Sequence, residues 1–127
     1  MQVEFILYVA DQAASRDFYR ALLAKEPALD VPGMTGFDLG GCRLGLMPTA
    51  GIAKIITPVL PHPDTAHAVP RCELYLPVIG LDKAMERGLA AGAVLVSPPA
   101  DRDWGHRVGY LADRDGHVVA LAEAGSE

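Results

Sequence analysis

Two stretches of the chain share one pattern of polar and apolar positions. The first begins at Glu4 and the second at Glu73, and in both the second, fourth and sixth residues are apolar. Alternation with a period of two predicts a β-strand whose two faces meet different surroundings. A helix-like segment follows each copy, so the chain is predicted to use one structural unit twice. We expect any functional site to lie where the two copies face each other.

The first copy is predicted to start with a strand at residues 3–9. Its side chains divide between one face with Phe5, Leu7 and Val9 and another with Glu4, Ile6 and Tyr8. Asp11 suits the N-cap of a helix at 13–24, because its carboxylate accepts the free N–H groups of a first turn. Residues 28–48 are strand-like and are divided by turn signals at Pro32-Gly33 and Gly40-Gly41. Of these, 34–39 and 42–47 can pair as a hairpin across Gly40-Gly41.

The second copy repeats this order of elements. Its predicted elements are a strand at 72–78, a helix at 83–91 capped by Asp82, and strands at 93–96, 107–112 and 117–123, with Pro98-Pro99 stopping the first of these three. Each half is therefore strand, helix and three strands. A half this small cannot bury its own sheet face, so the two halves are expected to pair.

A proline-rich connection separates the two copies. It contains Pro58, Pro61, Pro63 and Pro70 together with several isoleucines. A connection of this length is uncommon unless it has a function or is disordered. The isoleucines favour packing, with one helical turn near residues 52–56, over the site or against a partner subunit. The predicted organisation is a first module at 1–48, a connection at 49–70 and a second module at 71–127, within one structural domain.

Composition narrows the class of protein. The chain has 127 residues, 50% of them hydrophobic, and a net charge of −5. Its scattered Lys and Arg offer no basic stripe, so no nucleic-acid partner is expected. No apolar run reaches the roughly 20 residues needed to span a bilayer, and no basic leader precedes the first strand. We therefore expect a cytoplasmic protein with no membrane partner. Cys42 and Cys72 are expected to be free thiols, with one disulfide as the alternative.

Short motifs in both halves resemble one superfamily. Val9-Ala10-Asp11, followed by Ser15, Phe18-Tyr19 and Leu22-Leu23, is similar to the first strand and helix of the vicinal oxygen chelate superfamily, and Asp113-Arg114-Asp115-Gly116-His117 is similar to its closing hairpin. This superfamily includes glyoxalase I, bleomycin-resistance proteins and extradiol dioxygenases. The resemblance implies an α+β fold of two tandem βαβββ modules that form a curved mixed sheet around a cleft, usually in a homodimer.

The resemblance also implies where a metal ion would bind. Its metal-containing members use four inward-facing ligands, and the matching positions here are Glu4, Gly45, Glu73 and Ala120. Gly45 and Ala120 carry no donor atom, and two carboxylates make a poor site for Zn²⁺ or Fe²⁺. We therefore expect no metal and no other cofactor, as in metal-free members of the bleomycin-resistance type.

Glu4 and Glu73 are the sharpest candidates for function. Inside a cleft they would bind a cation or act as a general base; the structural alternative is that each pairs with an arginine such as Arg43 or Arg71. Trp104 can stack on a planar or cationic ligand, or it can be a hydrophobic plug or a dimer contact. The candidate ligand-binding residues are Glu4, Tyr8, Arg43, Met47, Glu73, Tyr75, Trp104 and His106, and the catalytic candidates are Glu4 and Glu73.

Two classes of function follow from these residues. The first is metal-independent binding of a small hydrophobic or cationic molecule in the cleft. The alternative is a lyase, isomerase or dioxygenase-related enzyme that uses Glu4 or Glu73 as a base or as a partial metal site. In a third hypothesis, the connection at 49–70 serves assembly. A small-molecule ligand and a homodimeric partner are expected in the first two cases.

Overall fold

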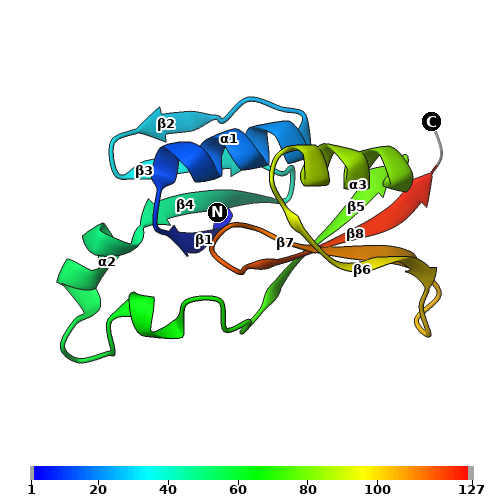
Figure 1. The fold of residues 1–127 in the computed structure, drawn as a ribbon. Helices are drawn as coiled ribbons and strands as arrows, with labels where there is room; N and C mark the ends of the chain where they lie inside the picture. Colours follow the sequence, from blue (N-terminus) through cyan, green and yellow to red (C-terminus); the bar gives the residue numbers. More distant parts are fainter. Residues whose placement is uncertain (1, 126–127) are drawn as a thin grey trace. The chain divides into compact units, whose positions relative to one another are not determined.

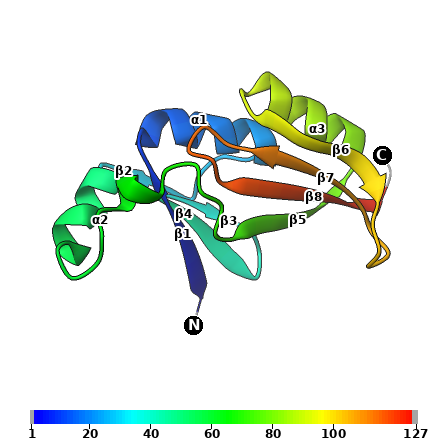
Figure 2. The same ribbon diagram turned by 60° about the horizontal axis from the view of Figure 1, so that its bottom comes forward.

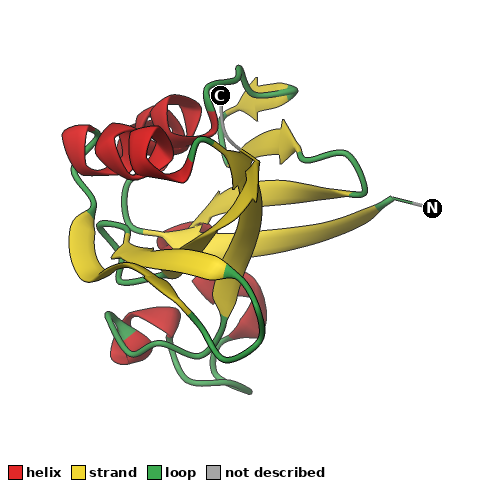
Figure 3. Cartoon of the chain, turned by 90° about the vertical axis from the view of Figure 1, so that its right-hand side faces the viewer, coloured by secondary structure: helices red, strands yellow, loops and turns green. Residues whose placement is uncertain are grey.

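The computed structural model describes residues 2–125, which divide into two compact units. The first unit is Met1–His67 and the second is Ala68–Glu127. Each unit contains its own four-stranded sheet. Both units contain helices and strands, as Figure 3 shows.

The first unit has one mixed sheet. Its elements are β1 (Val3–Val9), α1 (Gln12–Leu23), β2 (Leu29–Val31), β3 (Met34–Asp38), β4 (Cys42–Pro48), α2 (Thr49–Ile56) and the 3₁₀-helix η1 (Pro63–Ala66). The strands lie in the order β1-β4-β3-β2, with β1 parallel to β4 and the other neighbours antiparallel. Figure 1 shows α1 along one face of this sheet.

Helix α1 begins as the sequence predicts and determines which face of the sheet is covered. Asp11 is its N-cap, and Oδ1 of Asp11 accepts a hydrogen bond from the Ala14 N–H at 3.0 Å. Gln12 on the helix donates to Oγ1 of Thr35 at 2.9 Å, so Thr35 points toward α1. Side chains alternate along a strand, and Gly36 therefore belongs to the opposite face. We call this opposite side the helix-free face of the first sheet.

The second unit repeats the same topology. Its elements are β5 (Glu73–Ile79), α3 (Leu81–Ala90), β6 (Val94–Asp101), β7 (Arg107–Ala112) and β8 (Val118–Gly125). The strands lie side by side in the order β5-β8-β7-β6 (Figure 2), with β5 parallel to β8 and the other neighbours antiparallel. The predicted fold class is thereby confirmed: the chain is α+β and consists of two tandem βαβββ modules.

The predicted cap of α3 is wrong. The helix begins at Leu81, and its N-cap is Gly80, whose φ of 73° lies in the left-handed region that glycine adopts easily. Asp82 therefore lies in the first helical turn. There its Oδ1 accepts a hydrogen bond from Nη2 of Arg107 at 3.2 Å. The glycine turn starts α3 two residues before the predicted start at residue 83.

The predicted end of β6 is also wrong. The strand continues through Pro98 and Pro99 to Asp101, with register shifts between Leu95 and Ser97 and between Ser97 and Ala100. Proline cannot donate to a sheet ladder, but it is tolerated at an edge strand and at bulges. Strand β6 is the edge of its sheet, so its prolines bend the strand without ending it.

The proline-rich connection is more ordered than one helical turn. Helix α2 has 8 residues and buries Thr49 and Ala53, and η1 follows it. Cys42 and Cys72 are free thiols. Among the helices of residues 2–125, none has the length and apolar character required to cross a membrane.

Candidate functional site

Tyr75 and Tyr110 lie on the face of the second sheet that is opposite α3, which we call its helix-free face, and they pack against smaller side chains. A Cβ atom added at Gly109 would meet the side chain of Met85 on α3, so the side-chain position of Gly109 faces the helix. Its neighbours on β7 point the other way. On that side Tyr75 and Tyr110 pack against Val108, Ala120 and Ala122. The register places Tyr75 and Tyr110 on either side of Ala120.

The hydroxyl of Tyr75 is the centre of a hydrogen-bonded cluster. Nε1–H of Trp104 donates to this oxygen at 3.0 Å, and Nδ1 of His106 lies 2.5 Å from it. The rings of Tyr75 and His106 have centroids 5.9 Å apart and are tilted by 38°. Three of the residues predicted to bind a ligand are therefore brought together within one unit. We call them the Tyr75–Trp104–His106 cluster.

The loop between β6 and β7 holds Trp104 in place. Its backbone closes through a hydrogen bond from the Arg102 N–H to the His106 carbonyl at 2.9 Å, and Gly105 adopts a φ of 92°. The Arg102 side chain donates to the Val108 carbonyl at 2.9 Å and lies 5.1 Å from the Tyr110 ring centroid, a cation–π geometry. Trp104 nevertheless remains 55% exposed, so a fixed side chain presents a free aromatic surface.

Arg102 and Tyr110 are residues that the sequence analysis did not select. The alternation along residues 107–112 places Tyr110 on the same face as Val108, and this signal was available in the sequence. The role of Arg102 was not, because it depends on a loop that returns its guanidinium to β6 and β7. There it also donates to Oγ of Ser97 at 3.1 Å.

Glu73 lies on the same side of β5 as Tyr75, two positions earlier. Its side chain is exposed. Within residues 2–125 its carboxylate forms no hydrogen bond and no ion pair, so the alternative of a salt bridge to Arg71 is not observed. An exposed carboxylate adds a negative charge to this side of β5.

Glu4 lies over glycine on the helix-free face of the first sheet. A Cβ atom at Gly45 would be 2.9 Å from Oε1 of Glu4, and one at Gly36 would be 3.8 Å from it. Arg43 and Met47 share this face, where they are the register partners of Glu4 and Tyr8. In the described part of the chain the Glu4 carboxylate forms no ion pair, with Arg43 or otherwise. That Glu4 and Glu73 share one cleft stays a prediction.

The four positions that the superfamily resemblance assigns to metal ligands carry only two donor side chains. Glu4 and Glu73 offer carboxylates, but Gly45 has no side chain and the Glu4 carboxylate occupies the adjacent space. Ala120 is fully buried and has no donor atom. Zn²⁺ and Fe²⁺ sites use three or four protein ligands that usually include imidazole. No step of chemistry is therefore assigned to a metal at these positions.

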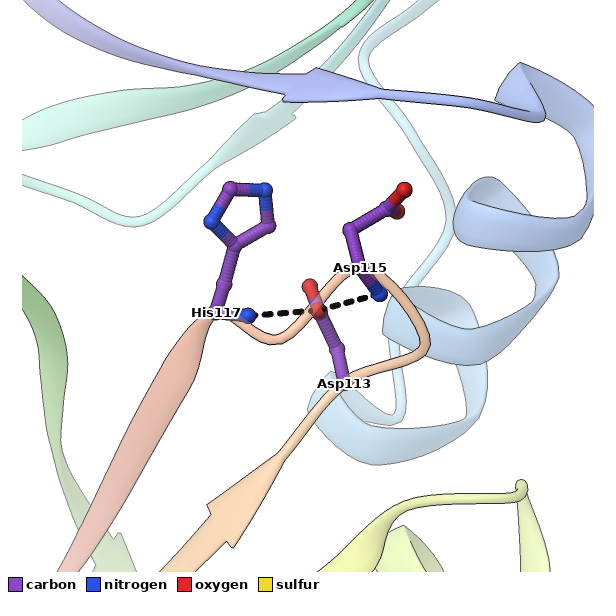
Figure 4. A group of neighbouring side chains, drawn as sticks. All are labelled: Asp113, Asp115 and His117. Atoms are coloured by element: carbon purple, nitrogen blue, oxygen red, sulfur yellow. Dashed lines mark hydrogen bonds between the residues drawn. The ribbon is translucent and has the colours of Figure 1, made fainter. Parts of the chain in front are cut away.

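A second cluster of potential ligands lies in the closing turn of the second unit. Asp113, Asp115 and His117 place ligand atoms within 4.8 Å of one another, the only such group of three found in residues 2–125. Figure 4 shows the Asp113 carboxylate accepting hydrogen bonds from the N–H groups of Asp115 and His117, both at 2.9 Å. Asp113 and Asp115 are buried. These bonds stabilise a tight turn in which Gly116 has a φ of 85°, which gives the cluster a structural role.

Comparisons with known proteins agree with this architecture. A family model described as the Glyoxalase/Bleomycin resistance protein/Dioxygenase superfamily matches residues 2–121. A glyoxalase-related enzyme from Fulvimarina pelagi is 24% identical with a TM-score of 0.81, and the match covers 97% of this chain and 87% of that one.

Two further solved structures are similar over most of their length. A glyoxalase/bleomycin resistance protein/dioxygenase family enzyme from Burkholderia phytofirmans PsJN is 18% identical with a TM-score of 0.81, covering 94% of this chain and 95% of that one. A protein of unknown function from Agrobacterium tumefaciens is 25% identical with a TM-score of 0.79, covering 98% and 94%. No curated protein matches the sequence. With two βαβββ modules and a family match along nearly its whole length, the chain belongs to the glyoxalase/bleomycin resistance protein/dioxygenase superfamily.

Proposed function

We propose that this protein binds a small, planar, hydrophobic or cationic molecule without a metal ion. The observation that carries the proposal is the Tyr75–Trp104–His106 cluster, in which an exposed indole is anchored through its N–H. An anchored aromatic side chain loses little conformational entropy when a ligand stacks on it, so less of the contact energy is offset and the affinity is higher. The ligand-binding surface is the helix-free face of the second sheet around this cluster.

Charge favours a cationic ligand over an anionic one. The face of an indole ring is the most favourable aromatic surface for a cation. Glu73 lies on the same side of β5 as Tyr75, and its carboxylate forms no ion pair with any residue in 2–125. The net charge of −5 acts in the same direction at longer range.

Fluorescence of Trp104 tests the proposal directly, since it is the only tryptophan of the chain. N-methylquinolinium and 2-naphthoate have similar planar shapes and opposite charges. We expect the cation to change the Trp104 emission saturably and to bind more tightly than the anion. The Trp104→Phe variant, followed by calorimetry, is the control and should bind more weakly. Absence of saturable binding by both compounds would reject the proposal.

The free carboxylates favour one second candidate, an enzyme of the lyase or isomerase type. Glu4 and Glu73 are both exposed, and neither is paired with another described residue, so each is available as a general base. Such a base would exchange a carbon-bound proton next to a carbonyl group. Incubation with dihydroxyacetone in D₂O, followed by NMR, detects this exchange. Protein-dependent exchange that is lost in Glu4→Gln or Glu73→Gln would favour the enzyme, whereas ligand binding without exchange would favour the binding protein.

A further inference from the structure

The hydroxyl oxygen of Tyr75 has two hydrogen-bond partners but only one proton. Nε1 of Trp104 is a donor without acceptor capacity, so it fills one lone pair of the Tyr75 oxygen. Nδ1 of His106, at 2.5 Å, can take either role. It either accepts the Tyr75 proton, which requires the Nε2–H tautomer of the imidazole, or donates its own proton to Tyr75, which requires the Nδ1–H tautomer.

The second arrangement turns Tyr75 into a donor for a ligand. When Trp104 and His106 both donate to its oxygen, the two lone pairs are filled and the hydroxyl proton points away from both partners. Hydrogen bonds in such a chain polarise one another, so this O–H becomes a better donor than an isolated phenol. An acceptor oxygen beside Tyr75 would therefore stabilise the Nδ1–H tautomer of His106.

We propose that Tyr75 binds a carbonyl oxygen of the planar ligand, and that His106 changes from its Nε2–H to its Nδ1–H tautomer on binding. The inference rests on the proposed function and adds the chemical class of the ligand, a planar molecule with a carbonyl group. Tyr75 keeps its proton throughout. His106 releases the Nε2 proton to water and takes a proton from water at Nδ1, so the net charge does not change.

The charged side chains around the cluster are bound to other groups or exposed, so the change of His106 tautomer involves only Tyr75, Trp104 and His106. Arg102 is bound to the Val108 carbonyl and lies over Tyr110, and Arg107 pairs with Asp82 and Glu123. The carboxylates on the neighbouring elements are Glu73 on β5 and Asp101 and Asp103 in and beside the loop, all exposed. The test therefore compares neutral ligands, whose affinities do not include an ionic attraction to these carboxylates.

The test uses 1-indanone and indane, which share one shape and differ in the carbonyl oxygen. Calorimetry should show 1-indanone binding about fivefold more tightly, as one neutral hydrogen bond implies. Tyr75→Phe should bring the ratio close to one, and it should weaken binding of both compounds because it removes the hydrogen bond that anchors Trp104. Tyr110→Phe, which keeps its ring under Arg102, should retain the ratio. Nitrogen-15 NMR of His106 under mildly alkaline conditions should show a proton on Nδ1 only in the 1-indanone complex.

Each other outcome counts against a defined part of the inference. Equal affinity for the two compounds in the unmodified protein would leave the aromatic surface in place and reject the role of Tyr75. A ratio that survives in Tyr75→Phe, or a His106 tautomer that is the same with and without 1-indanone, would also overturn it. Binding of neither compound would reject this inference, and the titration with N-methylquinolinium would then show whether the proposed function fails as well. The NMR measurement needs no variant, so it decides the question even if Tyr75→Phe fails to fold.

Discussion

Oε1 of Glu4 lies 2.9 Å from the position that a Cβ atom would take at Gly45. Cβ atoms in folded proteins essentially never have another heavy atom that close. Cγ1 of Ile6 lies at the same distance from that position. Glycine at residue 45 therefore gives the Glu4 side chain room to lie flat on the helix-free face of the first sheet. Gly36 is the register partner of Gly45 on β3, yet a Cβ there would have no neighbour closer than 3.8 Å.

These two glycines form a matched pair for mutation. Gly45→Ala forces Glu4 and Ile6 to move, and an Ile6 side chain displaced from its rotamer costs about 1 kcal/mol. Gly36→Ala meets only ordinary contacts and reduces the freedom of the unfolded chain, so it should be neutral or stabilising by about 0.5 kcal/mol. Urea unfolding of both variants measures the difference. Equal stability of the two would mean that the first sheet absorbs the new methyl group at either position.

Glu73→Gln should weaken the preference for cationic over anionic ligands by about 1–3 kcal/mol, as expected for a charge-assisted hydrogen bond. It should leave the free energy of unfolding unchanged, because Gln has the same shape and Glu73 is exposed without an ion pair among residues 2–125. Titration of both proteins with N-methylquinolinium and 2-naphthoate measures the preference. A large loss of stability would instead identify Glu73 as a structural residue.

Asp113→Ala should destabilise the protein by about 2–4 kcal/mol. It removes a buried carboxylate that accepts two backbone hydrogen bonds, and it leaves the N–H groups of Asp115 and His117 without this partner. Asp113→Asn keeps an acceptor oxygen and should cost about 1 kcal/mol. Arg114→Ala, at an exposed position of the same turn, should stay within about 0.5 kcal/mol of the unmodified protein. Thermal and urea unfolding check this order, and similar values for all three would contradict it.

Metal analysis of the purified protein should find well under one equivalent of transition metal per chain, because Gly45 and Ala120 offer no ligand. Chelators should leave the melting temperature unchanged. One equivalent of Zn, Ni, Mn or Fe would contradict the prediction. Its loss in His117→Gln would then place the ion at the closing turn of the second unit, where Asp113 and Asp115 lie beside His117.

Light scattering at tens of micromolar protein should give a molar mass twice the 13.5 kDa of one chain. Large apolar side chains are exposed on β1, where Phe5 is 66% exposed, and on the edge strand β6, where Val94, Leu95 and Val96 follow one another. Exposed apolar side chains of this kind favour association of identical chains. A monomeric mass over this concentration range would contradict the expected homodimer.

Most secondary-structure elements could be predicted because each depends on local chemistry. The period-two alternation at residues 3–9 and the Asp11 cap produced β1 and the start of α1 as expected. The errors arose where two local signals competed. Gly80 and Asp82 are both acceptable helix starts, and Pro98-Pro99 stops a central strand but only bends an edge strand. The position of a strand within its sheet is not a local property, so the sequence alone could not decide it.

The sequence predicted several individual residues of the candidate site, but it did not predict which of them contact one another. The alternation along β5 was enough to place Glu73 and Tyr75 on one face, and the loop position of Trp104 suggested an exposed aromatic side chain. Only the tertiary structure brought Trp104 and His106 to the Tyr75 hydroxyl and put Arg102 over Tyr110. The two contacts of the Tyr75 hydroxyl join positions about 30 residues apart, and their geometry depends on how the β6–β7 loop closes.

Three properties could be derived from the order of residues: the two βαβββ modules, the faces of their strands and the absence of donor atoms at Gly45 and Ala120. These properties follow from residue identity and from the period of the backbone, which act within a few positions of each residue. The tertiary structure alone decided that a tyrosine hydroxyl meets both an indole N–H and an imidazole nitrogen. A hydrogen bond requires two atoms within about 3 Å in a suitable direction, and only the folded chain defines such distances between residues on separate elements.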